Sequence, residues 1–291
     1  MRTDEPAADE VAAADARFAE WMRLNLARAA RHFGVDVDGE PTYGWRLRTI
    51  GAPVNGPAGR RWLRVVSEFP EYAAGDTWTG NSDANDLTGV PRARVLDVDE
   101  WTEADWRRQR AELMTLLPGQ TVSAADDLQH DPGLPETWWT GLAAALGALH
   151  RTKTSRSGIN VERTRERTQR VYGTPIGVDT WATIHGDLHW ANVFAPLLGI
   201  LDWEFWGRGP AGYDEATLFL FSLHIPAAAE RVRAAFGEIL DSPAGRTAQL
   251  IAAARLKDRI DDGDFPELAD ALSAHVDQLR SPFIGQRTVQ G

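Results

Sequence analysis

Residues 183–214 read TIHGDLHWANVFAPLLGILDWEFWGRGPAGYD, and no other stretch says as much about the fold. Asn192 follows Asp187 by five positions, and Asp202 lies ten positions beyond Asn192. A short apolar hairpin turning at Pro196 would bring Asp202 back toward Asn192. Hard cations such as Mg²⁺ bind carboxylate and amide oxygens, and a carboxylate outside the metal site can orient a hydroxyl for attack. The spacing therefore predicts Asn192 and Asp202 as metal ligands and Asp187 as the base.

These motifs resemble those of the aminoglycoside phosphotransferase and choline-kinase-like family. The matching residues are His185-Gly-Asp187-Leu-His189-x-x-Asn192, Ile200-Leu-Asp202-Trp-Glu204 and Gly209-Pro-x-x-Tyr213-Asp214. The resemblance implies an α+β, two-lobed protein-kinase-like fold, with a small β-rich lobe before a larger, mostly helical lobe. It also implies ATP and Mg²⁺ as cofactors, and a final Asp that buttresses the catalytic loop. The two histidines are expected to pack and orient the loop rather than to act as ligands or bases.

In the first lobe the resemblance is looser. Gly39 and Gly44 lie in a stretch that could turn over phosphates, because glycine lets backbone N–H groups approach closely, but a plain hairpin turn explains them equally well. Arg64 stands on an expected strand where the family has Lys, and it is a candidate phosphate anchor or a surface strand residue. Met114 and Leu116 resemble the family's hinge, whose backbone meets the adenine, and they also suit an ordinary buried strand.

The family places an acidic partner for this cation on a helix that follows the strand. Glu68, Glu71 and Asp83 are the candidates for that role in this chain. Residues 69–90 are rich in Gly, Asp and Asn, so the helix is expected to be short or absent.

Periodicity divides the rest of the chain. A helix is expected over residues 9–33 with a stop at Gly34, followed by strands over 43–54, 61–68, 95–98 and 111–117. Helices are expected over residues 136–150, 214–223, 227–240 and 245–260. The predicted organisation is an N-terminal helix (1–33), a nucleotide-binding lobe (34–117) and a catalytic and substrate-binding lobe (118–291).

The composition excludes several classes of protein. The chain has 291 residues, no cysteine and a formal net charge of −11, so disulfides and thiolate metal sites are ruled out and nucleic acid is not favoured as a partner. No apolar run reaches the roughly 18 residues of a membrane span, and the acidic start shows no secretory signal. A cytoplasmic protein is expected, and its oligomeric state stays open.

The leading hypothesis is ATP-dependent phosphoryl transfer to a hydroxyl of a small molecule. The acidic surface suits a cationic, aminoglycoside-like acceptor. A Ser or Thr kinase of a peptide natural-product pathway is an alternative, because residues 151–170 are rich in arginine, although a solvated helix face also explains that run. A non-catalytic nucleotide-binding partner subunit is the third hypothesis, since Arg64 and the poor glycine loop weaken the first lobe.

Overall fold

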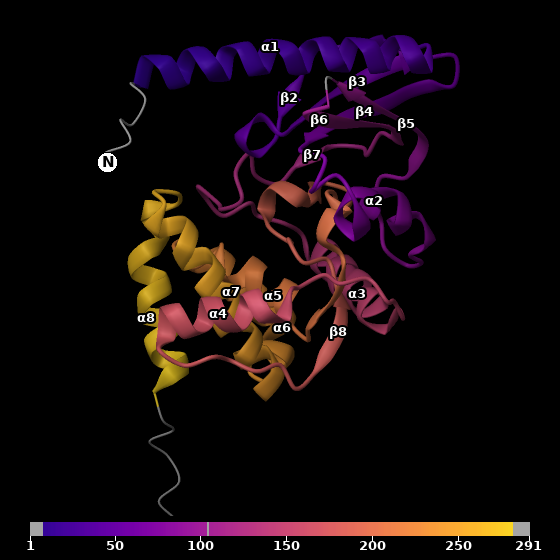
Figure 1. The fold of residues 1–291 in the computed structure, drawn as a ribbon. Coiled ribbons are helices and arrows are strands. Elements are labelled where there is room, and N and C mark those ends of the chain that lie inside the picture. The colour runs from indigo at the N-terminus through magenta and orange to yellow at the C-terminus, as the bar shows by residue number, and fades with distance from the viewer. Residues whose placement is uncertain (1–7, 104, 282–291) are drawn as a thin grey trace, which may run out of the picture. The chain divides into compact units, whose positions relative to one another are not determined.

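The computed structural model describes residues 8–103 and 105–281, so the ends of the predicted first and last segments, 1–7 and 282–291, lie outside the described residues. The chain is α+β, as predicted. It divides into two compact units (Figure 1). The first comprises the described parts of Met1–Asn85 and Ala93–Leu117, and the second comprises Asp86–Arg92 with the described part of Pro118–Gly291.

An antiparallel sheet forms the centre of the first unit. Its strands follow the order β1-β3-β4-β6-β5, and β2 also pairs with β3. The strands are β1 (Asp36–Val37), β2 (Thr42–Tyr43), β3 (Thr49–Gly56), β4 (Gly59–Glu68), β5 (Val95–Glu103) and β6 (Arg107–Thr115). The hairpin of β3 and β4 has a continuous register from Thr49↔Val66 to Gly56↔Gly59, which confirms the predicted antiparallel pair.

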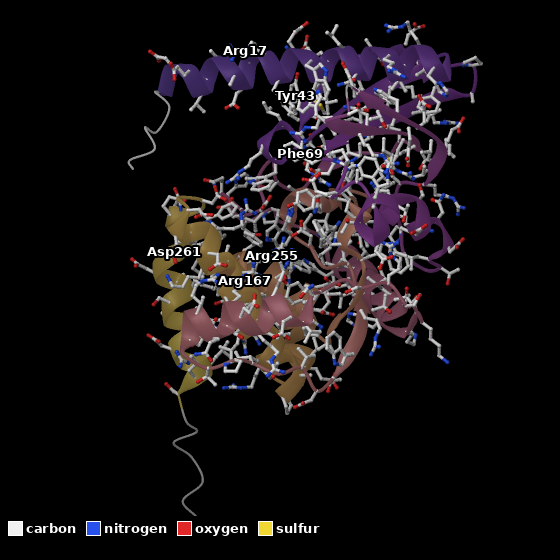
Figure 2. The ribbon with its side chains drawn as sticks, in the orientation of Figure 1. Arg17, Tyr43, Phe69, Arg167, Arg255 and Asp261 are labelled. Carbon is white, nitrogen blue, oxygen red and sulfur yellow. The ribbon has the colours of Figure 1, made fainter. Side chains whose placement is uncertain are left out.

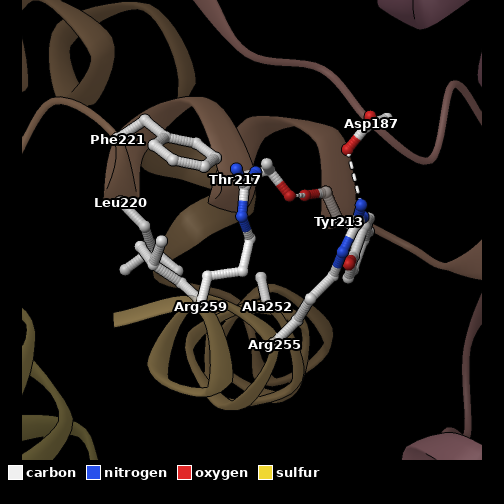
Figure 3. Close-up of a pocket in the computed structure, with 9 residues that line it drawn as sticks. Asp187, Tyr213, Thr217, Leu220, Phe221, Ala252, Arg255 and Arg259 are labelled. Carbon is white, nitrogen blue, oxygen red and sulfur yellow. Dashed lines mark hydrogen bonds and ion pairs between the residues drawn. The ribbon is translucent and has the colours of Figure 1, made fainter. Parts of the chain in front are cut away.

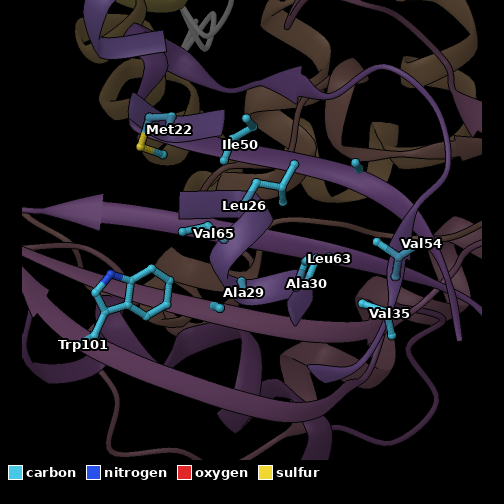
Figure 4. Close-up of a cluster of buried hydrophobic side chains, with 12 residues drawn as sticks. Met22, Leu26, Ala29, Ala30, Val35, Ile50, Val54, Leu63, Val65 and Trp101 are labelled. Atoms are coloured by element: carbon cyan, nitrogen blue, oxygen red, sulfur yellow. The ribbon is translucent and has the colours of Figure 1, made fainter. Parts of the chain in front are cut away.

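Helix α1 (Ala8–Phe33) covers one face of this sheet (Figure 4). Its apolar stripe, predicted from helical spacing, is buried at Met22, Leu26 and Ala29. Gly34 then ends the helix in the left-handed conformation, with φ of 63°. The next N–H, of Val35, donates to the carbonyl of Ala30 at 3.0 Å, so the predicted C-terminal stop is confirmed.

The two faces of β4 have different partners because successive side chains alternate. Leu63 and Val65 join the core beneath α1, and Val66 packs with Ala73 and Trp78 on the opposite side. Trp78 belongs to α2 (Gly75–Asp83), the short helix that the sequence left in doubt.

Three strand predictions in this unit were wrong in their limits, and the one over 95–98 covers only the start of β5 (Val95–Glu103). The expected strand over 43–54 is interrupted by a tight turn over residues 44–48, where Arg46 and Leu47 have positive φ values of 50° and 59°. An alternating pattern does not reveal such a turn, because it requires a backbone conformation that neither residue favours. The strand expected over 111–117 begins earlier, at Arg107, and ends at Thr115.

The second unit is mostly helical. Its helices are α3 (Glu136–Arg151), α4 (Val161–Tyr172), α5 (Tyr213–Leu220), α6 (Pro226–Leu240), α7 (Pro243–Asp261) and α8 (Ala269–Arg280). Two small antiparallel pairs join β7 (Gln120–Thr121) to β9 (Phe194–Ala195), and β8 (Trp181–Ile184) to β10 (Gly207–Pro210). In the described part of the chain, no helix combines the length and apolarity that crossing a membrane requires.

Candidate active site

The loop that carries Asp187 is held by hydrogen bonds to a buried carboxylate, that of Asp214. Strand β8 ends at Ile184, and the backbone N–H groups of His185 and Gly186 donate to Asp214 at 2.7 and 2.9 Å. Burial, and after it the neighbouring Glu215 carboxylate, raise the pKa of Asp214 to about 7, whereas the two N–H groups favour its charged form. Asp214 therefore buttresses the loop, as the resemblance implied.

Gly186 is required at its position in this loop. Its φ is 85°, and a Cβ there would lie 2.6 Å from the carbonyl oxygen of Phe205. Any other residue would both strain the backbone and push the loop away from this contact.

His185 links the Asp187 loop to the segment that carries Asp202. It is fully buried, its Nδ1 accepts from the N–H of Asp187 at 3.3 Å, and its Nε2 lies 2.7 Å from the carbonyl of Leu201. Burial lowers the pKa of His185 to about 4, so it is a neutral ring with its proton on Nε2. The predicted loop-orienting role is confirmed by these contacts.

The hairpin expected after Asn192 is present. The N–H of Phe194 donates to Gly199 at 2.9 Å, and the N–H of Leu201 donates to Asn192 at 2.8 Å. Asn192 and the residue before Asp202 are thus hydrogen-bonded neighbours. Asp202 itself adopts a left-handed conformation, with φ 58° and ψ 66°, which is costly for a residue with a side chain and is typical of functional positions.

These two residues fit a magnesium site. The amide nitrogen of Asn192 contacts the carbonyl of Asp187 and the Nε2 of His189, each at 3.0 Å, which leaves its oxygen as the donor atom for a cation. Among the residues that the structure describes, no group of three or more His, Cys, Asp or Glu forms a complete metal cage. Mg²⁺ usually keeps several waters and is bound by one or two protein oxygens together with phosphate oxygens of a nucleotide, so the side-chain oxygens of Asn192 and Asp202 are chemically suitable ligands.

Asp187 is held by a cation that sequence reasoning missed. Arg255 of α7 donates to Asp187 Oδ1 at 2.8 Å and to the carbonyl of Gly186 at 3.0 Å. On the other side, His189 Nε2 lies 3.7 Å from Asp187 Oδ2. Burial favours the neutral acid, but Arg255 and then the two nearby histidines outweigh it and hold the pKa of Asp187 well below its usual range. Asp187 is therefore a carboxylate at any ordinary pH.

Arg255 and Asp187 line a small cavity of about 20 Å³ between α5 and α7 (Figure 3). Arg259, one helical turn beyond Arg255, points toward the same space. The remaining lining residues are Tyr213, Thr217, Leu220, Phe221, Ala252 and Leu256. The cavity has room for about one water molecule and lies directly at the candidate base.

Similar folds are known among solved structures. No family model and no curated protein matches the chain. The aminoglycoside phosphotransferase APH(4)-Ia matches with a TM-score of 0.59, 15% identity and coverage of 88% of this chain and 100% of that one. The amicoumacin kinase hAmiN, solved with AMP-PNP, Ca²⁺ and Ami, gives 0.55 at 15% identity, covering 94% of this chain and 95% of its own. A choline/ethanolamine kinase family protein from Mesorhizobium loti gives 0.52 at 16%, with coverage of 91% and 96%.

This chain has an aminoglycoside-phosphotransferase-like fold. At these identities the likeness establishes the protein-kinase-like architecture that the motifs implied. The roles of individual residues rest on their own geometry.

The first unit of this kinase-like fold contains Arg64, whose side chain is 14% exposed. Arg64 lies opposite Glu112 in the register of β4 and β6, and it donates to Glu112 Oε2 at 3.2 Å. Asn81 of α2 donates to the same oxygen at 2.9 Å. Glu112 of the adjacent strand is thus an acidic partner of Arg64 that sequence reasoning missed, and the helix supplies the amide of Asn81. The assignment of Glu68, Glu71 or Asp83 to this role stays a prediction.

The other predicted nucleotide residues take separate places in the first unit. Gly39 lies between β1 and β2, which both pair with β3, and Gly44 opens the tight turn before β3. Gly39 and Gly44 therefore lie on either side of β2, and their contact with phosphates stays a prediction. Met114 is buried in β6 opposite Trp62, and Leu116 follows the end of that strand half-buried.

The sequence did contain a signal for Arg255. Ala248, Ala252, Arg255 and Arg259 recur at spacings of four, three and four, which places both arginines on the face of α7 that bears buried alanines. A charged residue on an apolar helix face is rarely buried without a partner. The partner itself could not be deduced, because Asp187 is far away in the chain.

Proposed function

We propose that the protein is a kinase that transfers the γ-phosphoryl group of ATP to a hydroxyl of a small molecule. The observation that carries the proposal is the assembly of Asp187, Asn192 and Asp202 on one loop and one hairpin, within a kinase-like fold. Loop, hairpin and buttress all belong to the second unit, which we assign as the catalytic lobe.

Asp187 would accept the hydrogen bond of the acceptor hydroxyl and take its proton as the new O–P bond forms. The bond between the γ-phosphorus and the β,γ-bridging oxygen breaks, and ADP leaves with that electron pair. A carboxylate with a low pKa is a weak base, but the loose transition state of phosphoryl transfer asks mainly for orientation and late proton removal. Before an acceptor binds, Arg255 holds this carboxylate, and the carbonyl of Gly186 accepts from the same guanidinium.

Asn192 and Asp202 would hold Mg²⁺ through their side-chain oxygens. When bound, the metal would neutralise charge on the phosphate oxygens. The protein's contribution is to keep both donors at one end of the hairpin, where the Leu201-to-Asn192 hydrogen bond fixes their spacing.

We assign nucleotide binding to the first unit, with Arg64 as the phosphate anchor. Arg can bind two phosphate oxygens with its fork, and Glu112 holds the side chain in place. Gly39 and Gly44 would contribute backbone N–H groups, and Met114 and Leu116 would lie along the adenine.

A second candidate function, a non-catalytic nucleotide-binding subunit, is favoured by one observation. The cation of the first unit is Arg64 rather than Lys, and it is paired with Glu112 of the adjacent strand. No comparable observation favours a peptide acceptor, because Arg167 and Arg170 of the arginine-rich segment are engaged with Asp258.

Release of phosphate from ATP into water separates these functions without a known acceptor. We expect slow, magnesium-dependent release by the parent chain and loss of release in both Asp187→Asn and Asp202→Ala. Binding of ATP by the parent with no release above that of the two variants would favour the non-catalytic subunit. Radiolabelled ATP with panels of sugars, amino alcohols, hydroxy acids and peptides would then identify the acceptor class.

A further inference from the structure

The charged side chains that line the cavity beside Asp187 are unusual for an enzyme that acts on a polycation. Its lining carries two guanidinium groups, Arg255 and Arg259, and Asp187 is its one carboxylate among the described residues. Asp187 must face the acceptor hydroxyl, so it is not available to bind an ammonium group of the acceptor. We propose that the acceptor carries an anionic group, such as a carboxylate, which Arg255 binds next to the reacting hydroxyl; this rests on the proposed kinase function.

Arg255 is placed to bind such a group. Its side chain (Figure 2) contacts Asp187, the carbonyl of Gly186 and the side chain of Tyr213, which leaves part of its five N–H donors for a ligand, and it is 33% exposed. A carboxylate of the acceptor would take donors from the guanidinium in a fork, the geometry in which Arg binds carboxylates most strongly. The hydroxyl on the same molecule would then lie beside Asp187, within a few ångströms of the bound carboxylate.

The nearby acidic residues do not provide a substitute site for a cation. Asp126 and Asp264 are outside the cavity lining, and Arg259 donates to them at 2.5 and 2.9 Å. Asp126 also lies 3.5 Å from Nδ1 of His189. These ion pairs occupy both carboxylates, so they are not a ready site for a cation, and they also compensate Arg259. Arg255 is therefore the guanidinium of the lining to which we assign the acceptor's anionic group.

The rest of the lining is apolar. Leu220, Phe221, Ala252 and Leu256 are each at most 6% exposed, and they line the cavity together with the polar groups. An acceptor that combines an acid group with a hydrocarbon or aromatic part matches this mixture, whereas a polyhydroxylated polyamine would leave its polar groups unpaired against it.

Binding of an acceptor carboxylate by Arg255 also explains how an oxygen of Asp187, the candidate base, becomes accessible to the hydroxyl. In the structure Arg255 occupies Oδ1 of Asp187, and the cavity of about 20 Å³ holds no more than a water. An acceptor must therefore displace the partly exposed arginine side chains. A carboxylate that draws Arg255 from Asp187 compensates the guanidinium and leaves Asp187 Oδ1 for the hydroxyl. A neutral or cationic acceptor would leave Arg255 uncompensated.

The test measures access to Arg255 and needs no turnover. The full chain is treated with the arginine reagent phenylglyoxal, and the modified peptides are quantified by mass spectrometry. Three probes of similar shape are compared: 3-phenyllactate, its neutral amide, and the cationic amino alcohol 2-amino-3-phenylpropan-1-ol. Arg163, exposed on α4, is the internal control that no probe should protect.

We expect 3-phenyllactate at about ten times its Kd to slow modification of Arg255 about tenfold, with little protection by the other two probes. Calorimetry should show the same preference among the three probes. Arg255→Gln should bind 3-phenyllactate at least about tenfold more weakly than the parent chain, and Arg255→Lys should recover part of the lost affinity. Far-UV circular dichroism checks that both variants are folded.

Any one of four results would overturn the proposal. Three concern protection of Arg255: the amide protects as well as 3-phenyllactate, the amino alcohol protects better, or no probe protects. The fourth is that Arg255→Gln binds 3-phenyllactate as tightly as the parent chain. The proposed function fails in a different way, through phosphate release that does not depend on Asp187 and Asp202. If 3-phenyllactate protects Arg255 and that release is absent, the anion site stands and its role as an acceptor site does not.

Discussion

The ion network under Arg64 allows a quantitative prediction about the first unit. Glu112 is 1% exposed and accepts from three groups: Arg64 at 3.2 Å, Asn81 at 2.9 Å and Arg110 at 3.0 Å. Arg110 has further partners in Glu100 and Ser82. The network is therefore asymmetric, because loss of one donor leaves Glu112 two others, whereas loss of Glu112 removes the shared acceptor from all three donors.

This asymmetry sets the order of the stability losses. Arg64→Ala removes the charge-assisted hydrogen bond to Glu112 and leaves that carboxylate with two donors, so we expect a loss of about 1.5–3 kcal/mol in the free energy of unfolding. Glu112→Ala removes the shared acceptor and leaves the largely buried Arg64 without this carboxylate, so we expect about 3–5 kcal/mol. Urea unfolding followed by circular dichroism measures both values.

Nucleotide affinity should change separately from stability. Arg64→Ala is expected to weaken ATP binding at least tenfold, or about 1.4 kcal/mol, with partial recovery in Arg64→Lys, because a point charge replaces the fork. Arg61→Ala is the matched control, since Arg61 belongs to the alternate set of β4 side chains and donates to the carbonyl of Arg60. Calorimetric titration with ATP gives the affinities.

Two results would refute this reasoning. If Glu112→Ala were no less stable than Arg64→Ala, the shared acceptor would not organise the network. If Arg64→Ala bound ATP as tightly as the parent, Arg64 would be removed from the nucleotide site, and the first unit would have to bind nucleotide in another way.

Three further predictions concern the second unit. Asp187→Asn preserves size and removes the carboxylate, so ATP binding should persist while phosphoryl transfer falls by about 10²–10⁴-fold; unchanged turnover would contradict the base assignment. Asp202→Ala should abolish the magnesium dependence of ATP binding in calorimetry without unfolding the chain, and parental Mg-ATP affinity would contradict the metal role. In the parent, Asp187 stays ionised as pH falls because Arg255 lowers its pKa, so the pH profile of phosphate release should show no acid limb from Asp187 down to about pH 5. Arg255→Met removes that cation and raises the pKa, so an acid limb should move toward neutral pH; identical profiles would show that Arg255 does not control the base.

The sequence predicted the parts of the site that are local in the chain. Asp187, Asn192 and Asp202 lie within 16 residues, and the intervening hairpin follows from a turn signal between two short apolar segments. The contact of Asp214 with the loop was implied by the family motif, and its two hydrogen bonds are present. Short separations leave few conformations in which such residues are apart, so spacing is informative there.

The first unit was less predictable because its details depend on pairing between strands. The alternation over 43–54 did not reveal the turn at Arg46 and Leu47, since the positive φ values are imposed by closure of β2 onto β3. The partner of Arg64 was sought along the following segment, whereas Glu112 reaches it through the register of β4 and β6, 48 positions away. Nothing in the sequence near Arg64 specifies which strand will lie beside it.

Arg255, which pairs with Asp187, depends both on the local sequence pattern and on tertiary packing. Its placement on the apolar face of α7 is a local property that the helical period contains, but its partner is set by the packing of α5 against α7 and by the buttressed loop. The acidic composition of the whole chain suggested a cationic acceptor, whereas the proposed anionic acceptor rests on the position of Arg255 in the cavity lining beside Asp187. Net charge describes the surface that a ligand meets at long range, whereas the groups within hydrogen-bonding distance decide which ligand is bound. Where the two disagree, the lining residues are the better guide to the acceptor.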